Sequence, residues 1–285
     1  MKAAPFDYVR AATVEEALSA LSGGARVLAG GQSLVPLLNQ RLVRPTTVVD
    51  VNRLDLDHLH ESGSDLVLGA LVRHRQVETS PLVRRRAPLL AEAMSHVGHV
   101  SVRNLGTVGG SAAHADPAAE LPAVCVALDA TFGVRGPGGP REIPARDFFL
   151  GPHRTALAPG ELLVEVRLPR PPPRSRHAVV KLSRRHNDLA LVAVVACVTV
   201  RDGVVTRARI AVAGAGPTPV RAGAAEALLV GRAPGHHAVA EAADAAADAT
   251  DPPDDRHAPA AYRREMAAVL TRRALRGALG QVVAP

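Results

Sequence analysis

Two pairs of adjacent glycines, each closely followed by a serine, are the residues of this chain whose types and spacing suggest chemistry. The first pair lies in Ala29-Gly30-Gly31-Gln32-Ser33, and the second lies in Thr107-Val108-Gly109-Gly110-Ser111. Glycine has no Cβ, so backbone amides beside it can turn toward an anion and approach it closely. Each pair follows apolar residues and precedes a possible helix, which is an arrangement that cradles phosphate. Two such cradles predict a ligand with two phosphates.

The glycine pairs differ from the common nucleotide-binding motifs. Neither fits the dinucleotide pattern GxGxxG or the triphosphate pattern GxxxxGK[ST], so we exclude an ordinary Rossmann or P-loop protein. The sequence carries no GxSxG nucleophile motif. Its histidines fall in pairs such as His58 with His60 and His96 with His99, without a third ligand at a recognisable spacing. We therefore expect no catalytic side chain and no metal site.

Cysteine count and charge exclude two further classes of function. The chain has 285 residues and 2 cysteines, Cys125 and Cys197, each inside an apolar run. An iron-sulfur cluster needs several cysteine ligands, so we expect buried thiols and no cluster. The net charge of +7 would suit nucleic acid, but the arginines are scattered and aromatic residues make up only 2% of the chain. Without stacking residues or a basic patch, we expect no nucleic-acid partner.

Hydropathy predicts a chain of the cytoplasm with no transmembrane segment. The longest apolar stretch, from Leu189 to Val200, is too short to span a bilayer. The first twenty residues carry Asp7, Arg10, Glu15 and Glu16 where a signal peptide would have an apolar core.

The elements that must position the glycine pairs follow from capping and periodicity. Thr13-Val14-Glu15-Glu16 is a capping box that predicts a helix, and residues 26–29 then form a strand that leads into the first pair. Ser33 is expected to cap a helix with Leu34, Leu37, Leu38 and Leu42 on its apolar face. Further strands are expected at 46–51, 65–70 and 161–168, a helix at 88–97, and a hairpin or loop at 135–144.

A proline triplet at 171–173 marks the expected domain boundary, which divides the chain into residues 1–174 and 175–285. Beyond it, β-rich runs at 179–182, 189–200 and 204–213 predict an antiparallel sheet. The third run would place Val204, Thr206, Ala208, Ile210 and Val212 on one face. Helices are expected at 238–250 and 262–279, the second burying Tyr262, Met266, Val269 and Leu270 against the sheet.

Several stretches together resemble the FAD-binding medium subunit of the molybdenum hydroxylases, the family of aerobic carbon monoxide dehydrogenase and xanthine dehydrogenase. The stretches are Phe6-Asp7-Tyr8, residues 29–37, residues 102–111, residues 114–122 and Lys181-Leu182-Ser183-Arg184-Arg185. They occur in the family's order and cover nearly the whole chain. The resemblance implies an α+β fold: a two-part FAD-binding domain of the PCMH type, then a smaller α+β domain with an antiparallel three-stranded sheet and a helix bundle.

The same resemblance implies which residues hold a non-covalently bound FAD. The residues that would wrap its pyrophosphate are Val27, Leu28, Ala29, Gly30, Gly31, Gln32, Ser33 and Leu34. The second wall would be Thr107, Val108, Gly109, Gly110 and Ser111. Consecutive backbone amides would offer the anion hydrogen bonds at both places.

Four further residues are candidates for contact with the cofactor, and three of them match family positions. Glu120 matches an acidic position, and because a carboxylate repels a pyrophosphate, we expect it to accept hydrogen bonds from cofactor hydroxyls. Asp116 is a second candidate, with a role in the turn before Pro117 as the alternative. Leu163 and Lys181 match positions at the flavin half. A cation there would stabilise the charge of a reduced flavin, whereas the alternative is a strand lysine that faces solvent.

One departure from the family is Leu189, which stands where an aromatic side chain often lies over the flavin. An aliphatic group there would change the cover of the ring. Leu105 likewise replaces a commoner polar or basic residue, and Val100-Ser101 replaces Pro-Gln.

The resemblance implies a flavoprotein subunit that accepts electrons from an iron-sulfur subunit with two [2Fe-2S] clusters and passes them to an external acceptor. A large subunit would hold the molybdopterin cofactor, in a dimer of heterotrimers. Two alternatives stay open: a stand-alone FAD-dependent oxidoreductase on the same fold, and a non-catalytic scaffold or nucleic-acid binder without cofactor. The choice of substrate would be made on another chain, and the sequence leaves the terminal acceptor open.

Overall fold

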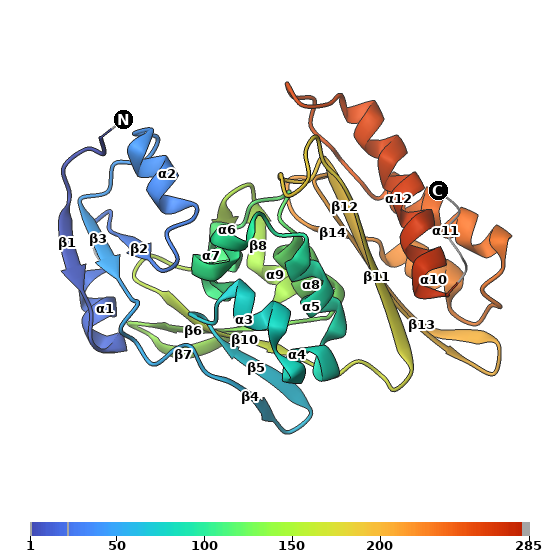
Figure 1. Ribbon diagram of the computed structural model, residues 1–285, viewed down its shortest axis with the longest axis horizontal. Coiled ribbons are helices and arrows are strands. Elements are labelled where there is room, and N and C mark those ends of the chain that lie inside the picture. The colour runs from blue at the N-terminus through green and yellow to red at the C-terminus, as the bar shows by residue number, and fades with distance from the viewer. Residues whose placement is uncertain (1, 22, 281–285) are drawn as a thin grey trace.

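A row of β-sheets runs along the molecule, with helices beside and between them (Figure 1). The computed structural model describes residues 2–21 and 23–280. The sheets have the strand orders β1-β3-β2, β4-β5-β10-β6-β7 and β11-β12-β13-β14, and β8 pairs with β9. The chain thus passes from a small N-terminal sheet through a central sheet to a C-terminal sheet.

The N-terminal sheet is parallel. Its elements are β1 (Asp7–Arg10), α1 (Val14–Ala20), β2 (Arg26–Leu28), α2 (Leu34–Asn39) and β3 (Thr47–Asp50). The capping box is confirmed, since Thr13 Oγ1 accepts a hydrogen bond from the amide of Glu16 at 3.1 Å and the Glu16 carboxylate accepts one from the amide of Ala12 at 2.7 Å. Ala17 of α1 is fully buried against Val49 and Val51.

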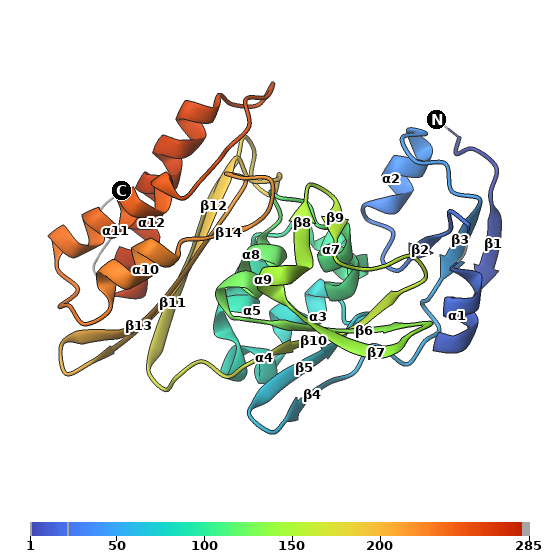
Figure 2. The same cartoon turned by 180° about the vertical axis from the view of Figure 1, so that it is seen from behind.

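The central sheet is antiparallel, and helices cover one of its faces (Figures 1 and 2). Its strands are β4 (Leu59–Ser62), β5 (Asp65–Gly69), β6 (Thr131–Gly136), β7 (Gly139–Pro144) and β10 (Leu162–Leu168). The helices are α3 (His74–Thr79), α4 (Pro81–Arg86), α5 (Pro88–Ser95), α6 (Val100–Leu105), α7 (Val108–His114), α8 (Glu120–Ala127) and α9 (Ala145–Phe148), followed by β8 (Phe149–Gly151) and β9 (Arg154–Thr155). The glycine- and proline-rich stretch at 135–144 does form a hairpin, made by β6 and β7.

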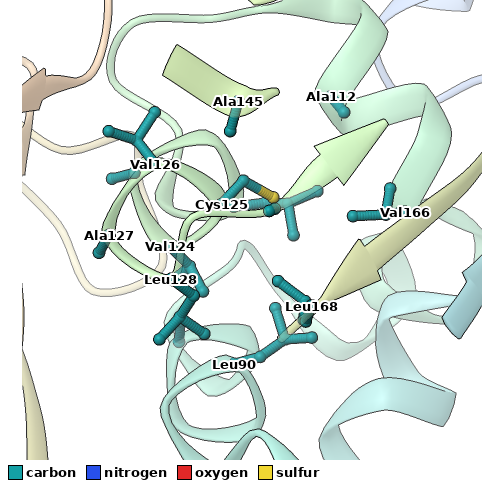
Figure 3. Packing of buried hydrophobic residues seen from close by; sticks show 14 of the residues in the cluster. Leu90, Ala112, Val124, Cys125, Val126, Ala127, Leu128, Ala145, Val166 and Leu168 are labelled. Carbon is teal, nitrogen blue, oxygen red and sulfur yellow. The ribbon is translucent and has the colours of Figure 1, made fainter. Parts of the chain in front are cut away.

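Helix α8 is the centre of the largest hydrophobic core. Every residue from Glu120 to Ala127 is buried, which is expected of a helix with core on all sides. Figure 3 shows Cys125 among Ala112, Val166 and Leu168 of this core. Burial raises the pKa of the Cys125 thiol to about 12, so this thiol is inert, as its apolar context predicts.

The C-terminal sheet has α5 and α8 on one face, and the helices α10 and α12 pack against its other face (Figure 1). Its elements are β11 (Ser175–Leu182), β12 (Val192–Arg201), β13 (Val204–Ala213), β14 (Val220–Arg221), α10 (Gly223–Leu229), α11 (His236–Asp248) and α12 (Ala260–Ala278). The expected strands are β11, β12 and β13, and the two-residue β14 extends the sheet. Leu189 lies before β12, not inside it as expected.

The face assignment predicted for β13 is wrong at its first residues. The pairing with β12 shifts by one residue at Thr199 and Val200, so that Thr206 is an extra residue in β13. Val205 therefore joins Ala208, Ile210 and Val212 in the core. A one-residue shift reverses which side chains face inward, and sequence alternation cannot reveal it.

The buried face predicted for α12 is also partly wrong. Leu270 is buried and Met266 and Val269 are partly buried, but Tyr262 is 40% exposed. The face that meets the sheet includes Arg263, Ala267, Ala274 and Ala278. Small side chains let the helix approach closely, and Arg263 is neutralised by two hydrogen bonds to Asp255, at 2.8 and 2.9 Å.

Candidate functional site

The two glycine pairs, far apart in the sequence, lie against each other at the junction of the N-terminal and central sheets. The first pair follows β2, and the second lies at the start of α7. A Cβ on Gly30 would lie 2.2 Å from the carbonyl oxygen of Leu105, and one on Gly110 would lie 3.8 Å from the Cβ of Ala29. Only glycine at position 30 permits this contact, because the backbone of Leu105 occupies the space of the side chain.

The first glycine loop presents free backbone amides. Gly31 has a φ of +71°, in the left-handed region that glycine adopts without strain. In the described part of the chain, the amides of residues 30–34 donate no hydrogen bond, while Gly30 O accepts one from Gln32 Nε2 at 3.1 Å. Ser33 makes no side-chain cap, so its predicted capping role is wrong. A run of unengaged N–H groups before α2 can offer hydrogen bonds to an anion.

The second glycine loop does not offer its amides in the same way. The amides of Val108 and Gly109 donate to the carbonyls of Val72 and Ala70, at 3.0 and 2.8 Å. The amide of Gly110 donates to Thr107 Oγ1 at 3.1 Å, which caps α7. The amide of Ser111 donates to Thr107 O at 3.0 Å. The prediction that both pairs cradle a phosphate with their amides is therefore wrong for the second pair, whose amides are hydrogen-bonded within the chain.

His74 supports the second glycine loop through a contact with Thr107. Its side chain is buried, and its Nε2 lies 3.0 Å from the carbonyl oxygen of Thr107. Burial lowers the pKa of His74 to about 4, against the opposing effect of that hydrogen bond, so the ring is neutral and Nε2 is the donor. A Cβ on Gly106 would lie 2.9 Å from His74 Nδ1, so glycine is required there too. No motif marked His74 in the sequence.

Glu120 and Lys181 form a buried ion pair across the boundary expected between the domains. Lys181 Nζ lies 2.6 Å from Glu120 Oε1, and the two side chains are 6% and 4% exposed. Lys181 also donates to the carbonyl oxygen of His96 at 2.8 Å. Burial raises the pKa of Glu120, although the charge and hydrogen bond of Lys181 oppose that rise. The alternative of a solvent-facing Lys181 is therefore wrong.

The remaining candidates differ in their surroundings. Asp116 Oδ1 accepts the amide of Ala118 at 2.9 Å, which is the turn role considered for it. Leu163 is buried in β10, within the largest core. Leu189 is 56% exposed in the loop between β11 and β12. Among the described residues, no three His, Cys, Asp or Glu side chains are placed to hold a metal, and no helix is long and apolar enough to cross a membrane.

Two family models cover nearly all of this chain. The model described as "FAD binding domain in molybdopterin dehydrogenase" matches residues 4–171, and the model described as "CO dehydrogenase flavoprotein C-terminal domain" matches residues 177–278. The chain belongs to the FAD-binding subunits of the molybdenum hydroxylases. FAD is accordingly its cofactor, and the protein is an oxidoreductase subunit.

Relatives and solved structures agree with the family models along the whole chain. The chain is 42% identical over 284 residues to the 6-hydroxypseudooxynicotine dehydrogenase complex subunit alpha of Paenarthrobacter nicotinovorans, covering 98% of this chain and 96% of the relative. It is 37% identical to the carbon monoxide dehydrogenase medium chain of Hydrogenophaga pseudoflava, covering 96% of each. A solved carbon monoxide dehydrogenase from that organism superimposes with a TM-score of 0.96 at 38% identity, covering 99% of this chain and 100% of the solved chain. The expected α+β fold is confirmed.

The residues at the glycine loops fit the dianionic diphosphate of FAD. The first loop supplies unengaged N–H donors on a backbone without bulky side chains, and Ser111 adds a hydroxyl that makes no hydrogen bond within the described chain. The second loop supplies a wall fixed by its own hydrogen bonds. When bound, FAD supplies the electron-transfer chemistry, and the protein supplies binding, orientation and electrostatics.

Proposed function

We propose that this chain is the flavin subunit of a multisubunit molybdenum hydroxylase, which receives electrons from an iron-sulfur subunit onto FAD and delivers them to an external acceptor. The partners would be a small subunit with two [2Fe-2S] clusters and a molybdopterin-containing large subunit, arranged as a dimer of heterotrimers. The observation that carries this proposal is similarity over the full length to chains named as medium chains or complex subunits. The two cysteines are buried and 72 positions apart in sequence, so the clusters would belong to another chain.

We assign the pyrophosphate of FAD to the first loop, Val27, Leu28, Ala29, Gly30, Gly31, Gln32, Ser33 and Leu34. Its amides would hold the anion, while the second loop, Thr107, Val108, Gly109, Gly110 and Ser111, would fix the depth and width of the site. The free amides of residues 30–34 and the engaged amides of residues 108–111 support this division of roles. Residues 1–174 would form the FAD-binding domain, and residues 175–285 the C-terminal domain.

The other assigned residues would act on the flavin half and the hydroxyls of the cofactor. Lys181 and Leu163 would lie toward the flavin, and Glu120 and Asp116 toward the cofactor's polar groups. Because Lys181 and Glu120 are paired, the site would present a dipole rather than a lone positive charge. Lys181 would then orient Glu120 as an acceptor and stabilise negative charge nearby.

Isolation of the chain from its own host tests this function. A tagged chain, expressed at its natural level, is expected to carry flavin absorbance and to bring down two further chains that contain molybdenum and iron. A yellow chain that purifies alone and is reduced directly by a small molecule would instead support the stand-alone oxidoreductase. A colourless chain that takes up no added FAD would support the scaffold.

A further inference from the structure

A polar link joins the two glycine loops, and Asn52 lies at its middle. Asn52 follows β3, and its Nδ2 donates to the carbonyl oxygen of Ala29 at 2.9 Å, directly before the first glycine pair. The same Nδ2 and the amide of Asn52 donate to Asp50 Oδ1 at 2.7 and 2.9 Å. Asp50 also accepts the hydroxyl of Tyr8. These bonds fix which end of the Asn52 amide faces the loop.

Arg73 continues the link to the second loop. Its Nη2 donates to Asn52 Oδ1 at 2.8 Å, and its Nη1 donates to the carbonyl oxygen of Leu105. Leu105 O is also the atom that would lie 2.2 Å from a Cβ on Gly30. The backbone of Arg73 pairs with Thr107 in an isolated β-bridge, and the next amide, of His74, donates to Gly106 O at 2.9 Å. The guanidinium therefore spans both loops from a backbone that is anchored on the second.

The link also connects two separate sheets. Asn52 lies at the end of the N-terminal sheet, while Arg73 follows β5 of the central sheet. The first glycine loop follows β2 of the N-terminal sheet, and the second is hydrogen-bonded to Ala70 and Val72, which follow β5 of the central sheet. The width of the site therefore depends on how the two sheets are held together. Apolar contacts among Val51, Leu54 and Leu71 hold the base of this junction, and the polar link lies at the loops themselves.

We propose that Asn52 and Arg73 are positioning residues for FAD, which set the separation of the two glycine loops so that the amides of residues 30–34 are aimed at the pyrophosphate. The planar fork of Arg73 carries this role, because it donates to two acceptors in fixed directions. Asn52 connects Arg73 to the first loop, since it accepts from Arg73 and donates to the carbonyl oxygen of Ala29. This inference rests on the proposed FAD site and adds residues that the sequence resemblance did not assign.

A double-mutant cycle in the full chain, stripped of flavin, tests the link. The variants are Arg73→Met, Asn52→Ala and their combination, and the measured quantity is the dissociation constant for added FAD. We expect each single variant to weaken binding about tenfold or more, since a charge-assisted hydrogen bond is lost. The double variant should bind no more weakly than the weaker single variant, because either change breaks the same link.

Two further variants separate geometry from charge. Arg73→Lys keeps the charge but loses the planar fork, so we expect it to bind FAD as weakly as Arg73→Met. Arg53→Met removes an equal charge beside Asn52 but breaks no hydrogen bond of the link, and should bind within about twofold of the wild type. Hydrogen exchange in the flavin-free variants should rise at Gly106 and at residues 108–110, whose amides are hydrogen-bonded in the folded chain.

The outcomes distinguish this inference from the site itself. Wild-type affinity in both single variants, additive losses in the double variant, or full rescue by Arg73→Lys would each overturn the positioning role while leaving the FAD site intact. A wild-type chain that does not take up FAD would overturn both. If Arg73→Met does not fold, Asn52→Ala decides the question alone, since the exposed Asn52 side chain is not needed for the core.

Discussion

Gly30 is where a single missing methyl group decides whether the site can form. The space that its Cβ would fill is taken by the backbone of Leu105 and Gly106, at 2.2 and 2.9 Å. A backbone neighbour cannot rotate away as a flexible side chain can. Any larger residue must therefore separate the two loops.

Gly30→Val should abolish FAD retention while the C-terminal domain stays folded. The ratio of flavin to protein absorbance after gel filtration measures retention, and far-ultraviolet circular dichroism measures folding. Gly235→Val is the matched control, because no atom of the described residues lies within 4 Å of a Cβ there and its φ of −81° suits valine. A Gly30→Val chain with full flavin content would show that the loops are not the walls of the site.

Lys181→Met should lower the free energy of unfolding by about 3 to 5 kcal/mol, because it leaves the buried carboxylate of Glu120 without its partner. The double variant Lys181→Met/Glu120→Gln removes both charges and should recover much of that loss. Denaturant titration of the two variants measures the difference. Equal stabilities would mean that Glu120 is not charged in the folded chain.

Residue types revealed the glycine pairs from the sequence alone, but not what their amides do. The amides of Val108 and Gly109 are engaged by Val72 and Ala70, which lie about forty positions earlier in the chain. Asn52, Arg73 and His74 belong to no motif, and their roles become visible only from their contacts in the folded chain. Long-range partners of this kind are set by tertiary packing, which local patterns do not encode.

At the scale of elements, capping and periodicity predicted most of the longer strands and the helices α1, α2, α5, α11 and α12, but not α3, α4, α6, α8, α9 or α10. The capping box at Thr13 and the β6–β7 hairpin are both present. The two wrong predictions of which residues face the core, in β13 and α12, share one cause. Alternation in β13 is broken by the extra residue Thr206, and α12 turns an alanine face with Arg263 toward the sheet. Register and helix rotation are chosen by the packing partner, and a single sequence does not show that partner.

His74 links α3 to the start of α7 and should make stability depend on pH. Its pKa in the folded chain, about 4, lies below the ordinary value of 6.5. Above pH 6.5 neither state is protonated. As pH falls from 6.5 toward 4, the unfolded chain takes up a proton that the folded chain refuses, so the free energy of unfolding falls by up to about 3 kcal/mol.

His74→Gln should remove that pH dependence, since glutamine keeps an N–H donor for Thr107 O but does not titrate. Denaturant titrations of both chains at pH 7 and pH 4.5 measure the effect, as the difference between the two chains at each pH. An equal loss of stability in both chains on acidification would mean that other groups account for it.

At the scale of the whole molecule, the expected domain boundary is not a boundary of the core. The largest hydrophobic cluster includes Leu90 and Val124 of the central helices together with Val179 and Val195 of the C-terminal sheet. The ion pair of Glu120 with Lys181 crosses the same interface. The proline segment at the predicted domain boundary therefore joins two parts that share one hydrophobic core.

This shared core predicts one cooperative unfolding transition rather than two. Asp129 adds to the coupling between the two parts. Its carboxylate forms ion pairs with two arginines of the C-terminal sheet, Arg209 at 3.1 Å and Arg221 at 2.9 Å. Scanning calorimetry of the flavin-free chain should show a single peak whose calorimetric and van't Hoff enthalpies agree. Two separate peaks would show that the sheets fold independently.

A chain cleaved between Arg170 and Arg174 should accordingly remain a complex of both fragments on gel filtration, because the buried interface persists when the proline segment is cut.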